Sequence, residues 1–133
     1  MDYAHVACIF SYEKHYHQVH FNGLADIWNY SIDHSVDLLP STDFIRVNRS
    51  FIINFKAIDE VKDESPKVTF LLLKELVGCR IDKIRGDDET NDQLETESVN
   101  SSCNFFRVRL SYERKKAFNQ AYNNYKATVK KEV

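Results

Sequence analysis

The sequence predicts a mainly β domain with short helices and one longer helix at its C-terminal end. Several short apolar stretches alternate with polar residues at a period of two, as half-buried strands do, whereas residues 111–131 carry apolar residues at helical spacing. Of the 133 residues, 43% are hydrophobic, which is enough to close one core and too little for two ordinary domains. We therefore expect a single domain over residues 1–133.

The N-terminal part predicts three strands and a short helix. Residues 5–21 mix apolar side chains with histidines and predict two strands joined around the segment SYEKH, and residues 24–31 are a third strand candidate. Residues 31–41 change to helical spacing, with Ser31 placed to cap the helix and Pro40 to end it. The residues able to share one face of this helix are Ile32, Val36 and Leu39.

The clearest strand pattern lies at residues 44–48. Polar side chains alternate there with Ile45 and Val47, which predicts a strand with these two residues inward. The next five residues, SFIIN, are apolar without alternation and predict a turn of helix that plugs the core.

Two further apolar stretches precede an acidic one. Residues 57–62 alternate again, with Ile58 and Val61 as anchors, and residues 67–81 are apolar enough for one long strand or a hairpin. Residues 82–102 are rich in Asp, Glu, Asn, Thr and Ser, which predicts a mobile acidic insertion.

The chain ends in a strand followed by a helix. Residues 104–110, NFFRVRL, resume the strand pattern, and residues 111–131 predict a helix with Ser111 as its cap. The face expected to pack on the core comprises Tyr112, Ala117, Phe118, Ala121, Tyr122 and Tyr125.

Charge is distributed unevenly along the chain. The formal net charge is −2, but residues 82–98 carry seven acidic and two basic residues. Residues 105–131 carry eight Lys and Arg against one Glu. A basic surface, as needed for contact with phosphates, is therefore expected at the C-terminal end.

The cysteines and the apolar segments favour a cytoplasmic protein. Cys8, Cys79 and Cys103 are odd in number, lie far apart and form no C-x-x-C pair, so neither a disulfide framework nor a zinc knuckle is indicated. No apolar run approaches the ~20 residues of a membrane-spanning helix. The N-terminus lacks the basic region of a secretion signal.

One stretch carries a resemblance to a known family. The segment FIRVNRSFIINFKAIDEV, at residues 44–61, resembles the signature of LytTR-type DNA-binding domains. In that signature a short strand ending in Arg-x-His-Arg-Ser precedes an aromatic or aliphatic run that ends in Asn, and another strand follows. The order of elements from Val6 to Tyr125 agrees as well. The matching positions are Arg46, Arg49, Ser50, Ile52, Ile53, Asn54 and Ile58.

The sequence departs from the family pattern at three places. Asn48 stands where the family usually has His, which keeps a donor and an acceptor but loses a titratable group. The last strand reads Val108, Arg109 and Leu110 where Val-Ser-Arg is usual, and the acidic insertion replaces a short turn.

The resemblance implies an elongated β-sheet domain that inserts loops into successive major grooves of duplex DNA. An Arg side chain can bind guanine O6 and N7 together, a pair worth about 1–3 kcal/mol of base discrimination. Carried over by position, the base-contact candidates are His15, Arg49 and Arg109. The phosphate-contact candidates, which would set the register without reading sequence, are Lys14, Arg46, Asn48, Ser50, Arg107 and Lys115.

The resemblance also implies partners. Regulators of this family, such as LytR- and AgrA-like response regulators of bacterial two-component systems, commonly bind paired direct repeats as dimers. No receiver domain precedes the motif here, so we expect either an excised output domain or a stand-alone form that receives its signal from a receiver or sensor partner. No cofactor is implied.

Two alternatives remain. The acidic insertion, Asn48 and Leu110 also suit a LytTR-like protein-interaction module that has lost DNA binding. His15 and His17 share one side of a strand near His20, a pattern that would suit a metal-dependent or ligand-binding enzyme, but no Cys or carboxylate at suitable spacing completes a metal site. No nucleophile motif or Gly-rich phosphate loop is present, so catalysis is not predicted.

Overall fold

The computed structural model describes residues 3–86 and 107–132. The larger of two antiparallel sheets has five strands in the order β3-β2-β1-β5-β4. Its members are β1 (Val6–Tyr12), β2 (His15–His20), β3 (Ala25–Ile27), β4 (Phe44–Arg46) and β5 (Phe51–Asn54). The two strands and the third strand expected from the N-terminal sequence are confirmed.

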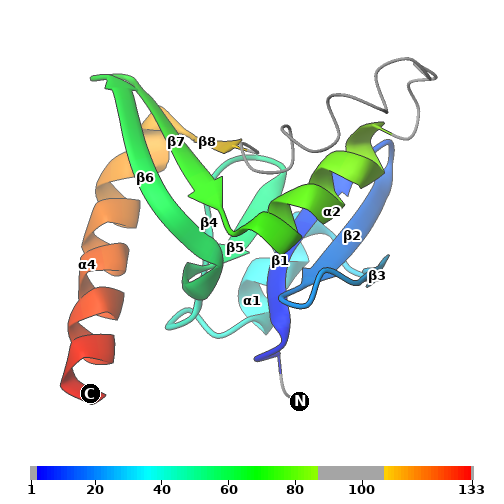
Figure 1. The fold of residues 1–133 in the computed structure, drawn as a ribbon, viewed down its shortest axis with the longest axis horizontal. Coiled ribbons are helices and arrows are strands. Elements are labelled where there is room, and N and C mark those ends of the chain that lie inside the picture. The colour runs from blue at the N-terminus through cyan, green and yellow to red at the C-terminus, as the bar shows by residue number, and fades with distance from the viewer. Residues whose placement is uncertain (1–2, 87–106, 133) are drawn as a thin grey trace.

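The smaller sheet has three antiparallel strands in the order β6-β7-β8. They are β6 (Ile58–Ser65), β7 (Val68–Leu73) and β8 (Arg107–Leu110). The strands predicted near residues 57–62 and 104–110 are therefore confirmed for the residues that the structure describes. Figure 1 shows the two sheets meeting at an angle where β5 leads into β6.

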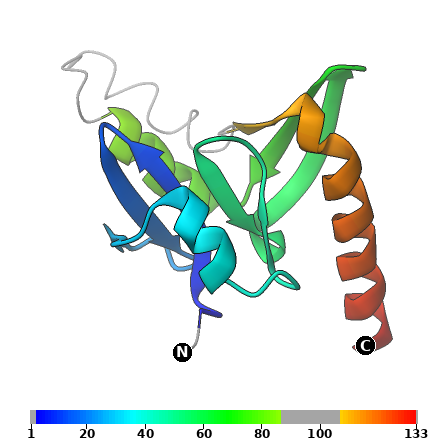
Figure 2. The same cartoon turned by 180° about the vertical axis from the view of Figure 1, so that it is seen from behind.

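Helices cover both sheets. Helix α2 (Glu75–Gly86) and helix α1 (Ile32–Leu38) lie on opposite faces of the larger sheet, as Figures 1 and 2 show. Helix α4 (Lys115–Glu132) runs along the outer side of the smaller sheet. Two single-turn 3₁₀ helices, η1 (Phe55–Ala57) and η3 (Tyr112–Arg114), precede β6 and α4. The mainly β fold with short helices and a C-terminal helix is confirmed.

The prediction of a helical turn at SFIIN is wrong, because Phe51–Asn54 is the strand β5. This strand lies between β1 and β4 and is buried on both faces. Phe51 and Ile53 pack into the core between the two sheets, whereas Ile52 packs into a second core beneath α1. A strand with two buried faces loses the apolar and polar alternation that identifies half-buried strands.

The prediction of one long strand or a hairpin over residues 67–81 is confirmed for residues 68–73 and wrong for the residues after them. Strand β7 ends at Leu73 and helix α2 begins at Glu75. Val77 and Ile81, one helical turn apart, are buried against the sheets and hold the helix in place. Helix α2 also takes residues 82–86 from the expected insertion, and residues 87–102 lie outside the described residues.

Helix α1 begins as predicted but buries a different face. Ser31 Oγ accepts a hydrogen bond from the amide of His34, so the predicted cap is confirmed. The predicted packing of Val36 is wrong, since its side chain is exposed and Ser35 takes the inward position. Ser35 is tolerated there because its hydroxyl accepts from Trp28 Nε1 at 2.7 Å and donates to the carbonyl of Ser31 at 2.6 Å.

The predicted inward residues of β4 and α4 are partly correct. Val47 is buried and Ile45 is half-buried. Phe118 on α4 is fully buried, but Tyr112 lies in η3 and is 57% exposed, and Ser111 before it makes no side-chain cap bond. No helix in the described ranges is both long and apolar enough to cross a membrane.

Candidate nucleic-acid interface

The turn between β4 and β5 is shaped by the side chain of Asn48. Its Oδ1 accepts hydrogen bonds from the backbone amides of Ser50 at 2.8 Å and Phe51 at 3.0 Å. Asn is well suited to such a turn because its short amide can replace a backbone acceptor. The turn that carries Arg49 therefore has a defined shape before any ligand arrives.

Arg46 holds the same turn from its other side. Its Nε donates to the carbonyl of Asn48 at 3.2 Å and its Nη2 to the carbonyl of Arg49 at 3.1 Å. Its Nη1 donates to Asp33 Oδ1 on α1 at 2.6 Å. Each guanidinium nitrogen thus has an acceptor within the protein, and one acceptor is a carboxylate.

Arg49 lies at the tip of this turn with an exposed side chain. Its backbone carbonyl is held by Arg46, but its guanidinium makes no hydrogen bond or ion pair within residues 3–86 and 107–132. The five N–H donors of this group are therefore available to an acceptor outside the protein.

Strand β8 lies against the same turn. Asn48 Nδ2 donates to the carbonyl of Arg109 at 2.7 Å, and the amide of Ser111 donates to the carbonyl of Val47 at 2.8 Å. Figure 2 shows the green turn between β4 and β5 beside the orange strand β8. These two bonds bring the exposed side chain of Arg109 to the groove that Arg49 lines.

The groove between the turn and β8 is open and strongly basic. Its volume is about 970 Å³, and its walls come from the β4–β5 turn, β7, the end of α2, β8 and η3. Among the described residues, one carboxylate, that of Glu113, lines it. Such an excess of positive charge attracts polyanions and raises their local concentration. The arginines that line the groove are Arg49, Arg85, Arg107, Arg109 and Arg114.

Comparison with known proteins gives this geometry a family. The family model described as the LytTr DNA-binding domain matches residues 2–84. The chain belongs to the LytTR family. A solved structure described as the LytTr DNA-binding domain of a methyl-accepting/DNA response regulator from Bacillus cereus has a TM-score of 0.62 and 19% sequence identity. That similarity covers 91% of this chain and 84% of the other.

The fold similarity extends beyond the matched sequence. The LytTR family match includes the β4–β5 turn and ends at residue 84, before β8 and α4. The comparison with the Bacillus cereus domain spans more of the chain and supports the same fold. A search of curated proteins found no match.

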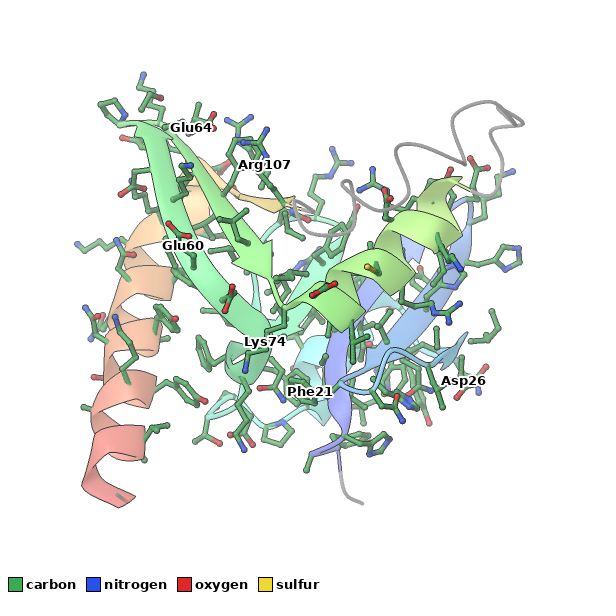
Figure 3. All side chains as sticks on the ribbon, in the orientation of Figure 1. Phe21, Asp26, Glu60, Glu64, Lys74 and Arg107 are labelled. Atoms are coloured by element: carbon green, nitrogen blue, oxygen red, sulfur yellow. The ribbon has the colours of Figure 1, made fainter. Side chains whose placement is uncertain are left out.

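Among the remaining phosphate-contact candidates in this LytTR domain, Arg107 lines the groove, but its guanidinium already has partners within the protein. Its Nη1 lies 2.8 Å from Glu64 Oε2, and its guanidinium carbon lies 4.3 Å from the ring centre of Phe70. Figure 3 shows Arg107 and Glu64 on the smaller sheet. The pair is half-exposed, so water and an incoming anion can compete for the guanidinium.

Lys115 lies away from the groove and binds Asp63, with 3.1 Å between Nζ and Oδ1. Hydrogen bonds from Thr69 and from Lys115 lower the pKa of the Asp63 carboxyl below its ordinary value. Lys115 therefore joins the start of α4 to the end of β6, and the structure does not place it beside Arg49.

The β1–β2 turn borders a second hollow. Glu13 and Lys14 have φ angles of 55° and 68°, the left-handed conformations of a tight hairpin turn. Lys14 lines a hollow of about 400 Å³ together with Arg46 and Arg49. Exposed His15 begins β2 and lines neither hollow. The structure thus brings Asn48, Ser50, Arg107 and Arg109 to Arg49 on one side, and Lys14 and Arg46 on the other.

Two groove arginines were missed by the sequence analysis. Arg85 falls in residues that were expected to be an acidic loop, and it reaches the groove because α2 ends there. The hydroxyl of Tyr12 donates to the carbonyl of Arg85 at 2.7 Å and fixes this end of the helix. Arg114 contributed to the basic charge expected at the C-terminal end, but it was not named as a candidate for DNA contact. The helical spacing of Val77, Ile81 and Ile84 was the signal for α2.

Two of the three histidines that suggested a metal site, His17 and His20, pack on aromatic neighbours. His17 stacks on Phe10 at 5.2 Å between ring centres, and His20 meets His5 edge to face at 4.7 Å. Burial lowers the pKa of both His17 and His20. In the part of the chain that the structure describes, no group of three His, Cys, Asp or Glu side chains is placed to hold a metal ion.

Proposed function

We propose that this LytTR domain binds duplex DNA sequence-specifically as the DNA-binding part of a bacterial transcriptional regulator. The observation that carries the proposal is a groove lined by five arginines, one of which is Arg49, whose exposed guanidinium is unpaired within the described residues. Because the turn beneath Arg49 is already hydrogen-bonded, little backbone conformational entropy is lost when the side chain meets a base.

Base reading is assigned to Arg49, Arg109 and His15, which would enter major grooves from the β4–β5 turn, β8 and the start of β2. Arg49 and Arg109 can each bind guanine through two hydrogen bonds. Lys14, Ser50, Arg107 and Lys115 are proposed to contact phosphates, which fix the register of the domain on DNA. For Arg107 and Lys115 this contact requires exchange of a surface carboxylate partner for a phosphate.

The wider setting follows from the family. We propose that two copies bind paired direct repeats in the cytoplasm and that a receiver or sensor partner supplies the signal. The alternative of an interaction module without DNA binding remains relevant because residues 87–102 contain six acidic residues and no basic one. Carboxylates near a basic groove would weaken its attraction for phosphate.

A salt titration of binding to random duplex DNA tests the proposal. We expect affinity to fall steeply as the salt concentration rises. The logarithm of the affinity should decrease with the logarithm of the salt concentration, with a slope of about 0.9 for each phosphate contact. Selection of bound sites from a random duplex pool then gives the operator. Failure to bind duplex DNA at low salt would support the interaction module instead. Binding that shows no preference after selection would reject sequence-specific recognition.

A further inference from the structure

The two arginines proposed to read bases come from different sheets. Arg49 lies on a turn of the five-stranded sheet, whereas Arg109 lies on β8 of the three-stranded sheet. Two base contacts can be made together only if the spacing between their side chains suits the spacing of the bases. A connection that holds this spacing is therefore as important as the two side chains.

Asn48 makes that connection with its side chain. Oδ1 accepts from the amides of Ser50 and Phe51, which fixes the turn, while Nδ2 donates to the carbonyl of Arg109, which fixes β8. The Asn48 side chain is thus bonded at both polar atoms within the protein. These bonds leave it poorly suited to the phosphate contact expected from the sequence.

The surrounding contacts make Asn48 a rigid connector. Its own carbonyl accepts from Arg46 Nε, and the preceding carbonyl, that of Val47, accepts from the amide of Ser111. The backbone bond sets where β4 and β8 meet, and the Asn48 amide sets the place of the Arg109 backbone at that junction. Hydrogen bonds to a half-buried amide restrict the motion of both partners.

We propose that Asn48 is a positioning residue that fixes Arg109 relative to Arg49 and thereby determines which spacing of bases the domain recognises. This inference rests on the proposed function, because it assigns a role within sequence-specific DNA binding. It replaces the phosphate-contact role of Asn48, and it gives Arg46 a supporting role on the turn in place of a phosphate contact.

The substitution Asn48→Asp separates the two functions of the amide. A carboxylate keeps an acceptor for the amides of Ser50 and Phe51 but has no hydrogen to donate to the Arg109 carbonyl. Asn48→His provides a conservative variant, because an imidazole can donate from one nitrogen and accept at the other. Asn123→Asp, on the exposed side of α4, adds the same charge away from the groove.

The measurement is the ratio of affinity for the selected operator to affinity for random duplex DNA. We expect Asn48→Asp to lower this ratio about fivefold, the effect of losing one hydrogen bond. Added negative charge weakens both kinds of binding, so it largely cancels in the ratio. Asn48→His should restore most of the ratio, and Asn123→Asp should leave it unchanged.

A second measurement excludes simple loss of folding. Amide hydrogen exchange should show that the amides of Ser50 and Phe51 remain protected in Asn48→Asp, while exchange at Ser111 becomes faster. A folded Asn48→Asp protein with an unchanged affinity ratio would overturn the positioning role. A wild-type protein with no preference for the operator would instead overturn the proposed function.

Discussion

Arg46 Nη1 lies 2.6 Å from Asp33 Oδ1, and this contact joins helix α1 to the turn that carries Arg49. The Asp33 side chain is 86% exposed, so the pair contributes little to stability. We expect Asp33→Asn to lower the free energy of unfolding by less than about 1 kcal/mol. The loss of a carboxylate beside the second hollow should raise affinity for random duplex DNA about twofold. Urea unfolding and a binding titration measure the two effects, and weaker DNA binding would contradict the electrostatic argument.

Arg49→Ala should remove a base contact while leaving the fold intact. The side chain is exposed and unpaired within the described ranges, so the melting temperature should hardly change. Affinity for the selected operator should fall by about 1–3 kcal/mol, and affinity for random duplex DNA should fall much less. Lys56→Ala removes an exposed charge outside the groove and serves as the control. Equal losses for both kinds of DNA would reject the base-reading role of Arg49.

Arg107→Ala should behave as the loss of a phosphate contact. Its guanidinium lines the groove beside Glu64 and above Phe70. We expect specific and random binding to weaken by similar factors and the slope of log affinity against log salt to decrease by about 1. A binding titration at several salt concentrations measures both quantities. An unchanged slope would show that Arg107 does not contact a phosphate.

Phe118→Ala should destabilise the whole domain. Phe118 is fully buried, and its ring centre lies 5.2 Å from that of Tyr122 and 6.4 Å from that of Phe55. Removing such a ring leaves a cavity where α4 meets the core, at a cost of about 3–5 kcal/mol. Urea unfolding gives this value directly. Val129→Ala, at a position 38% exposed on the same helix, should cost less than about 1 kcal/mol.

Acidification should destabilise the fold through two histidines. Burial lowers the pKa of His17 and His20, and repulsion from His15 and His5, respectively, lowers each further. The unfolded chain therefore binds protons first as the pH falls below about 6.5. The contribution of these two histidines to stability is constant above about pH 7 and decreases from there towards pH 5. The Asp63 carboxyl changes stability only at lower pH, because its pKa in the folded protein lies below 3.8.

Melting curves between pH 7 and pH 5 measure this effect. The double substitution His17→Gln and His20→Gln should flatten the dependence of the melting temperature on pH. Between pH 7 and pH 5, His17 and His20 together should take up no more than about two protons when the protein unfolds. A double variant with the same pH dependence as the wild type would assign the effect to other residues.

The sequence by itself determined the family and much of the secondary structure. The motif at residues 44–61 indicated LytTR, and the family match over residues 2–84 confirmed it. The half-buried strand β8 keeps an alternating pattern, and the long basic helix at the C-terminal end keeps an apolar stripe. Such elements bury one face, so their apolar residues recur at the period of a strand or a helix and can be recognised in the sequence.

Only the tertiary structure decided β5, α2 and the groove. Strand β5 is buried on both faces and therefore shows no alternation. Helix α2 follows β7 without a glycine or proline between them, so the helical spacing of Val77, Ile81 and Ile84 continues an apolar stretch with no marked boundary. Arg85, Arg109 and Arg49 reach one groove because packing brings three separate elements together. The hydrogen bond from Asn48 to Arg109 spans 61 positions of sequence. No local period encodes such a contact, because it forms only after both sheets have packed on their shared core.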